Sequence, residues 1–219
     1  MKFATLNFQN NPNIGLFAFA TDSFCLANNF IGEKAAALIH KTLRVPVHRT
    51  RMLGTGLIGI FAAGNAKGIV ISDRIHHEEI AQIKKKCDVL VLETKHTAMG
   101  NLILANDRGC IISKELEGLG QDIEAFLGVE TKVGTIAGMD LVGSLAIANS
   151  KGCLIHKAAT TKEKELIGKT LDVAVLPGSV NFGNQWIRSG LIANSHGFVS
   201  GDRTSGPELG LVAETLGFV

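Results

Sequence analysis

Four cysteines and seven histidines are the residues of this chain that could carry nucleophilic chemistry. A cysteine nucleophile needs a base within hydrogen-bond reach, and no histidine lies in a motif that pairs with a cysteine. Cys25, Cys110 and Cys153 share one position of an internal repeat, where the other two copies carry Ile69 and Phe198. A position that accepts Ile and Phe is a packing position, at which free cysteine behaves as a small apolar side chain. The spacing therefore argues against a thiol enzyme.

Metal and phosphate chemistry also lack a matching motif. His76 and His77 are adjacent on an expected helix. Adjacent helical residues point to different faces, so a solvated surface explains them better than a metal site. The glycine-rich segment 54–56 lacks the Lys-Ser/Thr pair of a phosphate-binding loop and does not open a helix. We therefore predict that the protein uses no cofactor and no metal.

Composition narrows the class of protein further. The 219 residues are 46% apolar and 19% charged, which is enough for a sizeable core. A net charge of +2 gives no strong basic field for DNA. The longest apolar run, 57–63, is too short to span a bilayer, and the first residues lack the apolar stretch of a signal peptide. With four cysteines in no paired spacing, we predict a soluble cytoplasmic protein.

The element that positions these residues is a β-hairpin, seen most fully in LVGSLAIANSKGCLIH at 141–156. Asn149 opens the turn and can hydrogen-bond the backbone two residues on. Gly152 closes the turn, and we expect it to adopt the left-handed conformation of a hairpin with a G1 bulge. The pattern occurs five times, with steps of 44, 41, 43 and 45 residues between the equivalent positions Phe24, Gly68, Gly109, Gly152 and Gly197.

A helix follows each hairpin, and a further strand follows four of the helices. The predicted helices are 33–43, 73–86, 114–127, 161–169 and 207–216, and the predicted strands are 45–49, 88–93, 130–136 and 172–176. Two helices begin with capping boxes, Thr160 with Glu163 and Ser205 with Glu208, in which side chains satisfy free amides of the first turn.

The fifth copy lacks its last strand, and the N-terminus carries a surplus one at 3–8. Pairing that segment with the fifth copy would close the five units into a ring and remove exposed strand edges. No linker separates the copies. The sequence therefore predicts an α+β fold in one domain, 1–219: a five-bladed β/α propeller of pseudo-symmetric strand–hairpin–helix repeats, closed by the N-terminal strand.

Several motifs resemble the translation initiation factor 6 family of ribosome anti-association factors. They are Ala98-Met99-Gly100-Asn101, Asn106-Asp107-Arg108-Gly109, Leu141-Val142-Gly143-Ser144, Gly178-Ser179-Val180-Asn181 and the GDRTSGPEL segment at 201–209. The resemblance covers the whole chain in order. The chain stops where archaeal members stop and lacks the polar tail of eukaryotic ones, so we expect an archaeal protein.

The resemblance implies the pentein fold and a non-enzymatic function. Members bind the large ribosomal subunit on its inter-subunit face, mainly through ribosomal proteins, and keep the small subunit off by occlusion. Adjacent ribosomal RNA is a further candidate contact, and we expect a monomer. The pentein fold also carries guanidino-group hydrolases and amidinotransferases, which form the alternative function. A third reading is a ring-shaped binding module with another partner.

The expected contact surface is one rim of the ring. Each hairpin also carries a glycine near its start, at Gly15, Gly59, Gly100 and Gly143, and Arg188 replaces it in the fifth copy. The residue after this position varies from aliphatic to amide to hydroxyl, so it should be partly exposed; these residues are Leu16, Ile60, Asn101, Ser144 and Ser189. The resemblance places ribosome contacts at this rim, and the candidates are Gly100, Asn101, Ile60, Ser144, Trp186 and Arg188.

Three alternatives stay open at this stage. Asn101 could instead cap a strand end, and Trp186, the one tryptophan, could lie buried between blades. The lysine runs at 84–86 and at Lys162 and Lys164 fit either a solvated surface or a ribosomal RNA contact.

Overall fold

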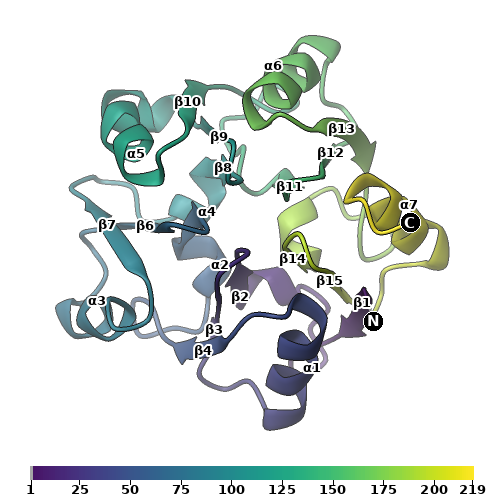
Figure 1. Ribbon diagram of the computed structural model, residues 1–219, viewed down its shortest axis with the longest axis horizontal. Coiled ribbons are helices and arrows are strands. Elements are labelled where there is room, and N and C mark those ends of the chain that lie inside the picture. Colours follow the sequence, from purple (N-terminus) through teal and green to yellow (C-terminus); the bar gives the residue numbers. More distant parts are fainter. Residues whose placement is uncertain (1) are drawn as a thin grey trace.

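The computed structural model describes residues 2–219, and its repeating unit is a three-stranded sheet with a helix beside it. Within each sheet the second strand of an antiparallel hairpin also pairs with a third, parallel strand. Figure 1 shows the five sheets about a common centre with the longer helices outside them. The sheets are β2 (Ala18–Ala20), β3 (Cys25–Asn28), β4 (Val47–Thr50); β5 (Ala63–Asn65), β6 (Gly68–Ser72), β7 (Asp88–Leu92); β8 (Ile103–Ala105), β9 (Gly109–Ile112), β10 (Glu130–Val133); β11 (Ala146–Ala148), β12 (Gly152–His156), β13 (Ala174–Gly178); and β14 (Leu191–Ala193), β15 (Phe198–Gly201), β1 (Phe3–Leu6).

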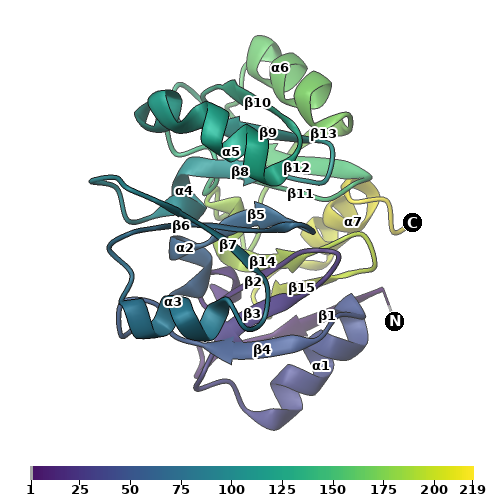
Figure 2. The same cartoon turned by 60° about the vertical axis from the view of Figure 1, so that its left-hand side comes forward.

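The outer helices match the predicted ranges in the first, fourth and fifth copies, whereas the helix of the second copy is shorter than the predicted 73–86 at both ends. They are α1 (Glu33–Leu43), α3 (His77–Ile83), α5 (Gly120–Leu127), α6 (Thr161–Leu171) and α7 (Gly206–Thr215). Figure 2 brings α3 and α5 forward, outside the second and third sheets. Both predicted capping boxes are present. The range 114–127 is divided into a 3₁₀ helix, η2 (Lys114–Leu119), and α5, in a stretch that Gly118 and Gly120 weaken as α-helix.

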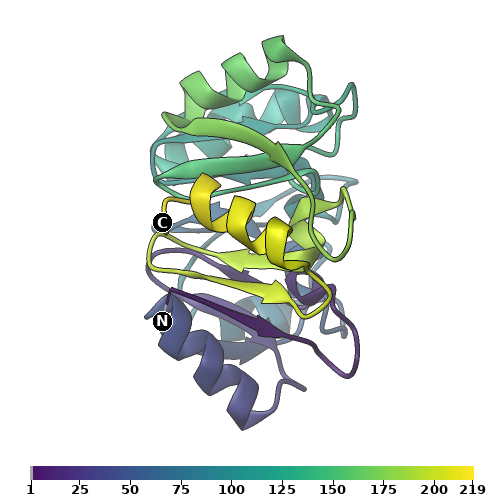
Figure 3. The same cartoon turned by 90° about the vertical axis from the view of Figure 1, so that its right-hand side faces the viewer.

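The N-terminal strand belongs to the fifth sheet, as predicted. β1 runs parallel to β15, from Phe3 opposite Phe198 to Leu6 opposite Gly201. The Phe3 and Phe198 rings stack with their centroids 5.3 Å apart. Figure 3 shows this strand, in purple, beside the yellow-green hairpin from the other end of the chain. The first and last segments of the chain are therefore joined in one sheet.

The apolar pattern at the start of each predicted hairpin is not all strand. Short helical turns precede the first strand of the hairpin in four copies: η1 (Ile14–Leu16), α2 (Ile58–Phe61), α4 (Met99–Leu102) and η3 (Ile187–Gly190). In the fourth copy, 142–144 form a turn, and β11 begins only at Ala146. Several apolar residues of these turns are buried, among them Ile58, Met99 and Leu102, so the hydrophobic pattern of the turns cannot be told from that of a strand.

The predicted role of the turn glycines was also wrong. A left-handed conformation requires a positive φ, and none of the four turn glycines has one; these are Gly68, Gly109, Gly152 and Gly197. Glycine is needed at these positions because the backbone of another element comes so close that a Cβ would not fit. A Cβ on Gly109 would collide with the Thr170 carbonyl at the end of α6, and a Cβ on Gly152 would collide with the Thr215 carbonyl at the end of α7.

The apolar cores lie between neighbouring copies, and three cysteines belong to them. Each cluster combines side chains from adjoining copies; one joins Ala63 and Val70 of the second to Ile103 and Leu127 of the third. The side chains of Cys25, Cys110 and Cys153 are fully buried, which confirms their packing role. None of the helices in residues 2–219 combines the length and the apolar composition of a membrane-spanning segment.

Candidate functional site

Glycines bring the short helical turns of neighbouring copies into backbone contact around the centre. A side chain at any of four positions would strike the preceding copy: at Gly15 the carbonyl of Arg188, at Gly59 that of Gly15, at Gly100 that of Gly59, and at Gly143 that of Gly100. The fifth copy has Arg188 at this position, and its amide donates to the Ser144 carbonyl at 3.1 Å. Each copy is thus linked to the next, and the first to the fifth.

A pocket of about 420 Å³ opens at this end of the molecule. The residues that follow the glycine position all line it and are all partly exposed, as the sequence predicts: Leu16, Ile60, Asn101, Ser144 and Ser189. Trp186 and Arg188 line it too. Five of the six candidate contact residues therefore meet in one pocket. The sixth, Gly100, is buried beneath it in the backbone contact with Gly59.

Asn101 does not cap a strand with its side chain. Its backbone amide donates to the Ala98 carbonyl at 2.9 Å, and its carbonyl accepts from the Gly143 amide at 3.0 Å. Within the described part of the chain its side-chain amide forms no hydrogen bond, and only its backbone groups are paired. Asn101 therefore presents one acceptor and two donors to whatever enters the pocket.

Trp186 lies at the edge of the pocket and is 46% exposed, so the alternative of a tryptophan buried between copies is wrong. Hydrogen bonds hold its backbone in place. Its amide donates to Asn184 Oδ1 at 3.0 Å, and its carbonyl accepts from Ser189 Oγ at 2.7 Å. An exposed indole on a fixed backbone is typical of an interface anchor.

Arg188 sends its side chain across the centre of the molecule. Nη2 donates to the Ala62 carbonyl of the second copy at 2.8 Å, and the guanidinium lies 5.2 Å from the centre of the Phe19 ring. Burial lowers the pKa of Arg188 to about 10, so the side chain is charged at neutral pH. Arg188 was a candidate because it replaces a glycine of the repeat, but its contacts with Ala62 and Phe19 have no signal in the local sequence.

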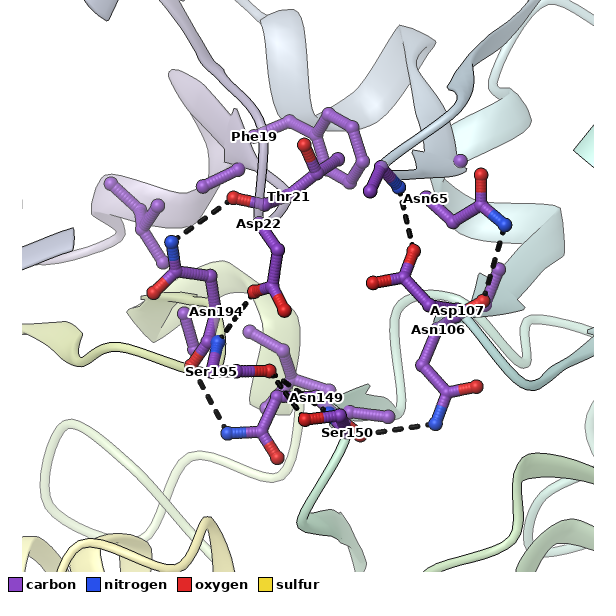
Figure 4. A pocket seen from close by; sticks show the side chains of 18 of the residues that line it. Phe19, Thr21, Asp22, Asn65, Asn106, Asp107, Asn149, Ser150, Asn194 and Ser195 are labelled. Carbon is purple, nitrogen blue, oxygen red and sulfur yellow. Dashed lines mark hydrogen bonds between the residues drawn. The ribbon is translucent and has the colours of Figure 1, made fainter. Parts of the chain in front are cut away.

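The opposite end of the molecule is organised by the turn asparagines, as Figure 4 shows. Asn106 Oδ1 accepts from the backbone amides of Arg108 and Gly109, as predicted for an asparagine at the start of a turn. Its Nδ2 donates to the Asn149 carbonyl at 3.0 Å and to the Leu171 carbonyl at 2.9 Å. This second function was not predicted, although four asparagines at one repeat position were the signal for it.

The same pattern repeats at Asn65, Asn149 and Asn194, each of which donates to the next turn and to the end of a helix. Thr21 holds this position in the first copy. Its hydroxyl accepts from the Ser23 and Phe24 amides but reaches no neighbouring copy. The seam between the first and second copies therefore lacks the asparagine link.

The cysteines are unsuited to nucleophilic catalysis. Burial raises the pKa of Cys25, Cys110 and Cys153 to about 12, and burial together with Asp88 raises that of Cys87 to about 11. These thiols are protonated at neutral pH, whereas a reactive cysteine needs a depressed pKa and access to solvent. In residues 2–219 no three His, Cys, Asp or Glu side chains are grouped so that they could hold a metal ion.

The lysine run at 84–86 lies beside the seam between the first and second copies. With Lys67 and His48 it lines a groove of about 420 Å³. Burial and the charge of Lys86 lower the pKa of His48. Four lysines and a single aspartate, Asp88, line the groove, so it is positively charged.

Comparison with known proteins gives one consistent result over the length of the chain. The sequence profile of the eIF-6 family matches residues 3–215. The chain is 36% identical to translation initiation factor 6 of Pyrococcus horikoshii and 37% identical to that of Thermococcus gammatolerans, with 100% of each chain covered. It is 31% identical to translation initiation factor 6 of Methanosphaerula palustris, with 98% of each chain covered. All three organisms are archaea. Since profile and relatives agree from end to end, the chain belongs to the eIF-6 family.

Proposed function

We propose that this protein is a translation initiation factor that binds the inter-subunit face of the large ribosomal subunit and blocks association with the small subunit. Family membership and the names of the relatives support the role in translation initiation. The observation that carries the finer proposal is the convergence of Ile60, Asn101, Ser144, Trp186 and Arg188 on one pocket. An exposed tryptophan and an amide without an internal partner are suited to binding a macromolecular surface.

We infer that the whole chain, 1–219, is one domain with the closed five-unit pentein fold. The pairing of β1 with β15 supports closure, because it gives the fifth unit the strand that its own segment lacks. A rigid body of this kind is sufficient for steric occlusion, which requires only affinity and bulk. The protein would act as a cytoplasmic monomer without a cofactor, mainly through ribosomal proteins and with adjacent ribosomal RNA as a secondary contact.

The enzymatic alternative has less support. A guanidino-group hydrolase or amidinotransferase needs a nucleophilic thiolate, and burial keeps three of the four thiols protonated and out of contact with solvent. The relatives bear the name of a translation factor rather than that of an enzyme.

Co-sedimentation with salt-washed large subunits tests the proposed binding, with small subunits as the negative control. The protein should pellet with large subunits only, and both Asn101→Ala and Ser144→Phe should weaken binding without lowering the melting temperature. Lys162→Ala, on the exposed outer face of α6, is the control and should bind normally, because isolated exposed charges contribute at most about 1 kcal/mol. Normal binding by both pocket variants together with weak binding by Lys162→Ala would place the contact face elsewhere.

A further inference from the structure

The charge of Arg188 is uncompensated. The side chain forms no ion pair with any carboxylate in residues 2–219. A guanidinium has five N–H donors, and the hydrogen bond to the Ala62 carbonyl uses one of them. The Phe19 ring covers one face of the group without neutralising it. A largely desolvated cation with unused donors gains more from an anionic partner than an exposed one does.

Arg188 lines two spaces in the molecule, and only one of them suits an anion. At the end that carries the turns, Arg188 borders a cavity of about 50 Å³ that Asp22 and Asp107 also line. That space suits one or two water molecules, and the two carboxylates repel an anion. At the other end Arg188 borders the pocket of about 420 Å³, and it is the one charged residue among those that line this pocket.

The composition of the pocket favours a carboxylate over a phosphate chain. RNA carries a charge on every nucleotide, so an RNA site needs several cations along its path. The lining of this pocket contains one cation, Arg188, together with neutral amides and hydroxyls and the apolar side chains of Leu16, Ile60, Leu141 and Trp186. A protein surface that presents one acidic side chain among apolar ones matches that arrangement, and the planar guanidinium can bind a carboxylate through two parallel hydrogen bonds.

We propose that Arg188 binds a single carboxylate, from an aspartate or glutamate side chain of the protein that docks over this pocket. This inference rests on the proposed function, because it assumes that the docking protein is a component of the large ribosomal subunit. Arg188 is then the residue that selects an acidic partner, while Asn101 and Trp186 supply the surrounding polar and apolar contacts.

Trp186 makes the carboxylate site directly measurable, because it is the one tryptophan of the chain and lies at the edge of the pocket. Sodium acetate serves as the probe, titrated at constant ionic strength against sodium chloride. We expect a saturable change in tryptophan fluorescence with a midpoint on the order of millimolar, as befits a single small ion. Arg188→Gln should abolish the change. Arg188→Lys, which keeps the charge but not the planar fork, should weaken it.

A second measurement, binding to large ribosomal subunits, tests whether Arg188 contributes to the complex. Arg188→Gln should bind large subunits at least about thirtyfold more weakly than the unaltered protein, because it leaves the partner's carboxylate buried and unpaired. Arg108→Gln is the matched control, since it removes the same charge from the opposite end, where Arg108 forms an exposed ion pair with Asp172. It should bind normally.

The outcomes separate this inference from the proposed function. Failure of the unaltered protein to pellet with large subunits overturns the proposed function but leaves the acetate titration informative. An acetate response that is absent, or the same in Arg188→Gln, overturns the carboxylate site. So does normal subunit binding by Arg188→Gln, and so does a stronger response to inorganic phosphate, which would favour RNA. Should Arg188→Gln fail to fold, the titrations of the unaltered protein and of Arg188→Lys decide.

Discussion

Asn101 and Asn106 lie five positions apart, and their side chains have opposite relations to the rest of the molecule. The Asn106 amide is buried and satisfied on both sides, by its own turn through Oδ1 and by two other segments through Nδ2. The Asn101 amide has no partner within residues 2–219 and faces the pocket. One asparagine therefore holds neighbouring copies together, and the other is available for binding.

The contrast predicts opposite effects of one substitution. Asn106→Ala should lower the free energy of unfolding by roughly 2–4 kcal/mol, because it leaves the Asn149 and Leu171 carbonyls and two turn amides without partners. Asn101→Ala should change it by less than about 0.5 kcal/mol. Urea unfolding of the two variants measures both values. Equal losses would show that Asn101 also has a structural role.

At the scale of elements, helix-capping carboxylates fasten the start of a helix to the loop before it. Glu163 completes the capping box of α6 and also accepts from the Thr135 hydroxyl and the Ala137 and Gly138 amides. Glu208 does the same for α7 with Ser179, Phe182 and Gly183. Burial alone would raise the pKa of each carboxyl, but hydrogen bonds to the ionised form outweigh it and lower the pKa to about 2.

This depression makes stability depend on acid pH. The ordinary pKa is 4.5, so the stabilisation is complete above that value and is lost as the pH falls towards about 2. Glu163→Gln should remove its part of the pH dependence, on the order of 1 kcal/mol once partial exposure is allowed for. Glu165→Gln, exposed on the same helix, is the control. Identical slopes of unfolding free energy against pH in both variants would show that the Glu163 contacts are unimportant.

How much of this could be predicted depends on whether a feature is local in the chain. The capping boxes and the turn asparagines act over two or three residues, so their types and spacing were sufficient. The short helical turns and the turn glycines depend on backbone from another copy, which no local pattern encodes: Gly100 meets Gly59, about forty residues away, and Gly109 meets Thr170, about sixty residues away. Arg188 is the clearest case, because its guanidinium ends against Ala62, 126 positions away in sequence.

For the molecule as a whole, the N-terminal strand joins the two ends of the chain. β1 supplies the outer strand of the fifth sheet, and the Lys2 carbonyl accepts from the Phe198 amide at 3.0 Å. The Phe3 ring stacks on the ring of Phe198, which is fully buried. The fifth sheet therefore depends on the first residues of the chain.

Removing residues 1–8 should destabilise the entire molecule and not only its edge, because it exposes the long edge of β15 and the apolar side chains beneath it. Thermal unfolding followed by circular dichroism should show a lower melting temperature in a single transition. Deleting Val219, which is 91% exposed, is the control and should have little effect. A shortened protein that melts with the intact one would show that strand pairing at this point is dispensable.

Occlusion is the central claim, and subunit joining tests it most directly. Purified large and small subunits are mixed in magnesium-containing buffer with increasing amounts of this protein, and the joined ribosome is measured by sucrose-gradient sedimentation. We predict that joined ribosomes fall in proportion to added protein and vanish near one molecule per large subunit, with the protein migrating with free large subunits. Undiminished joining at saturation, with the protein bound to large subunits, would contradict the account.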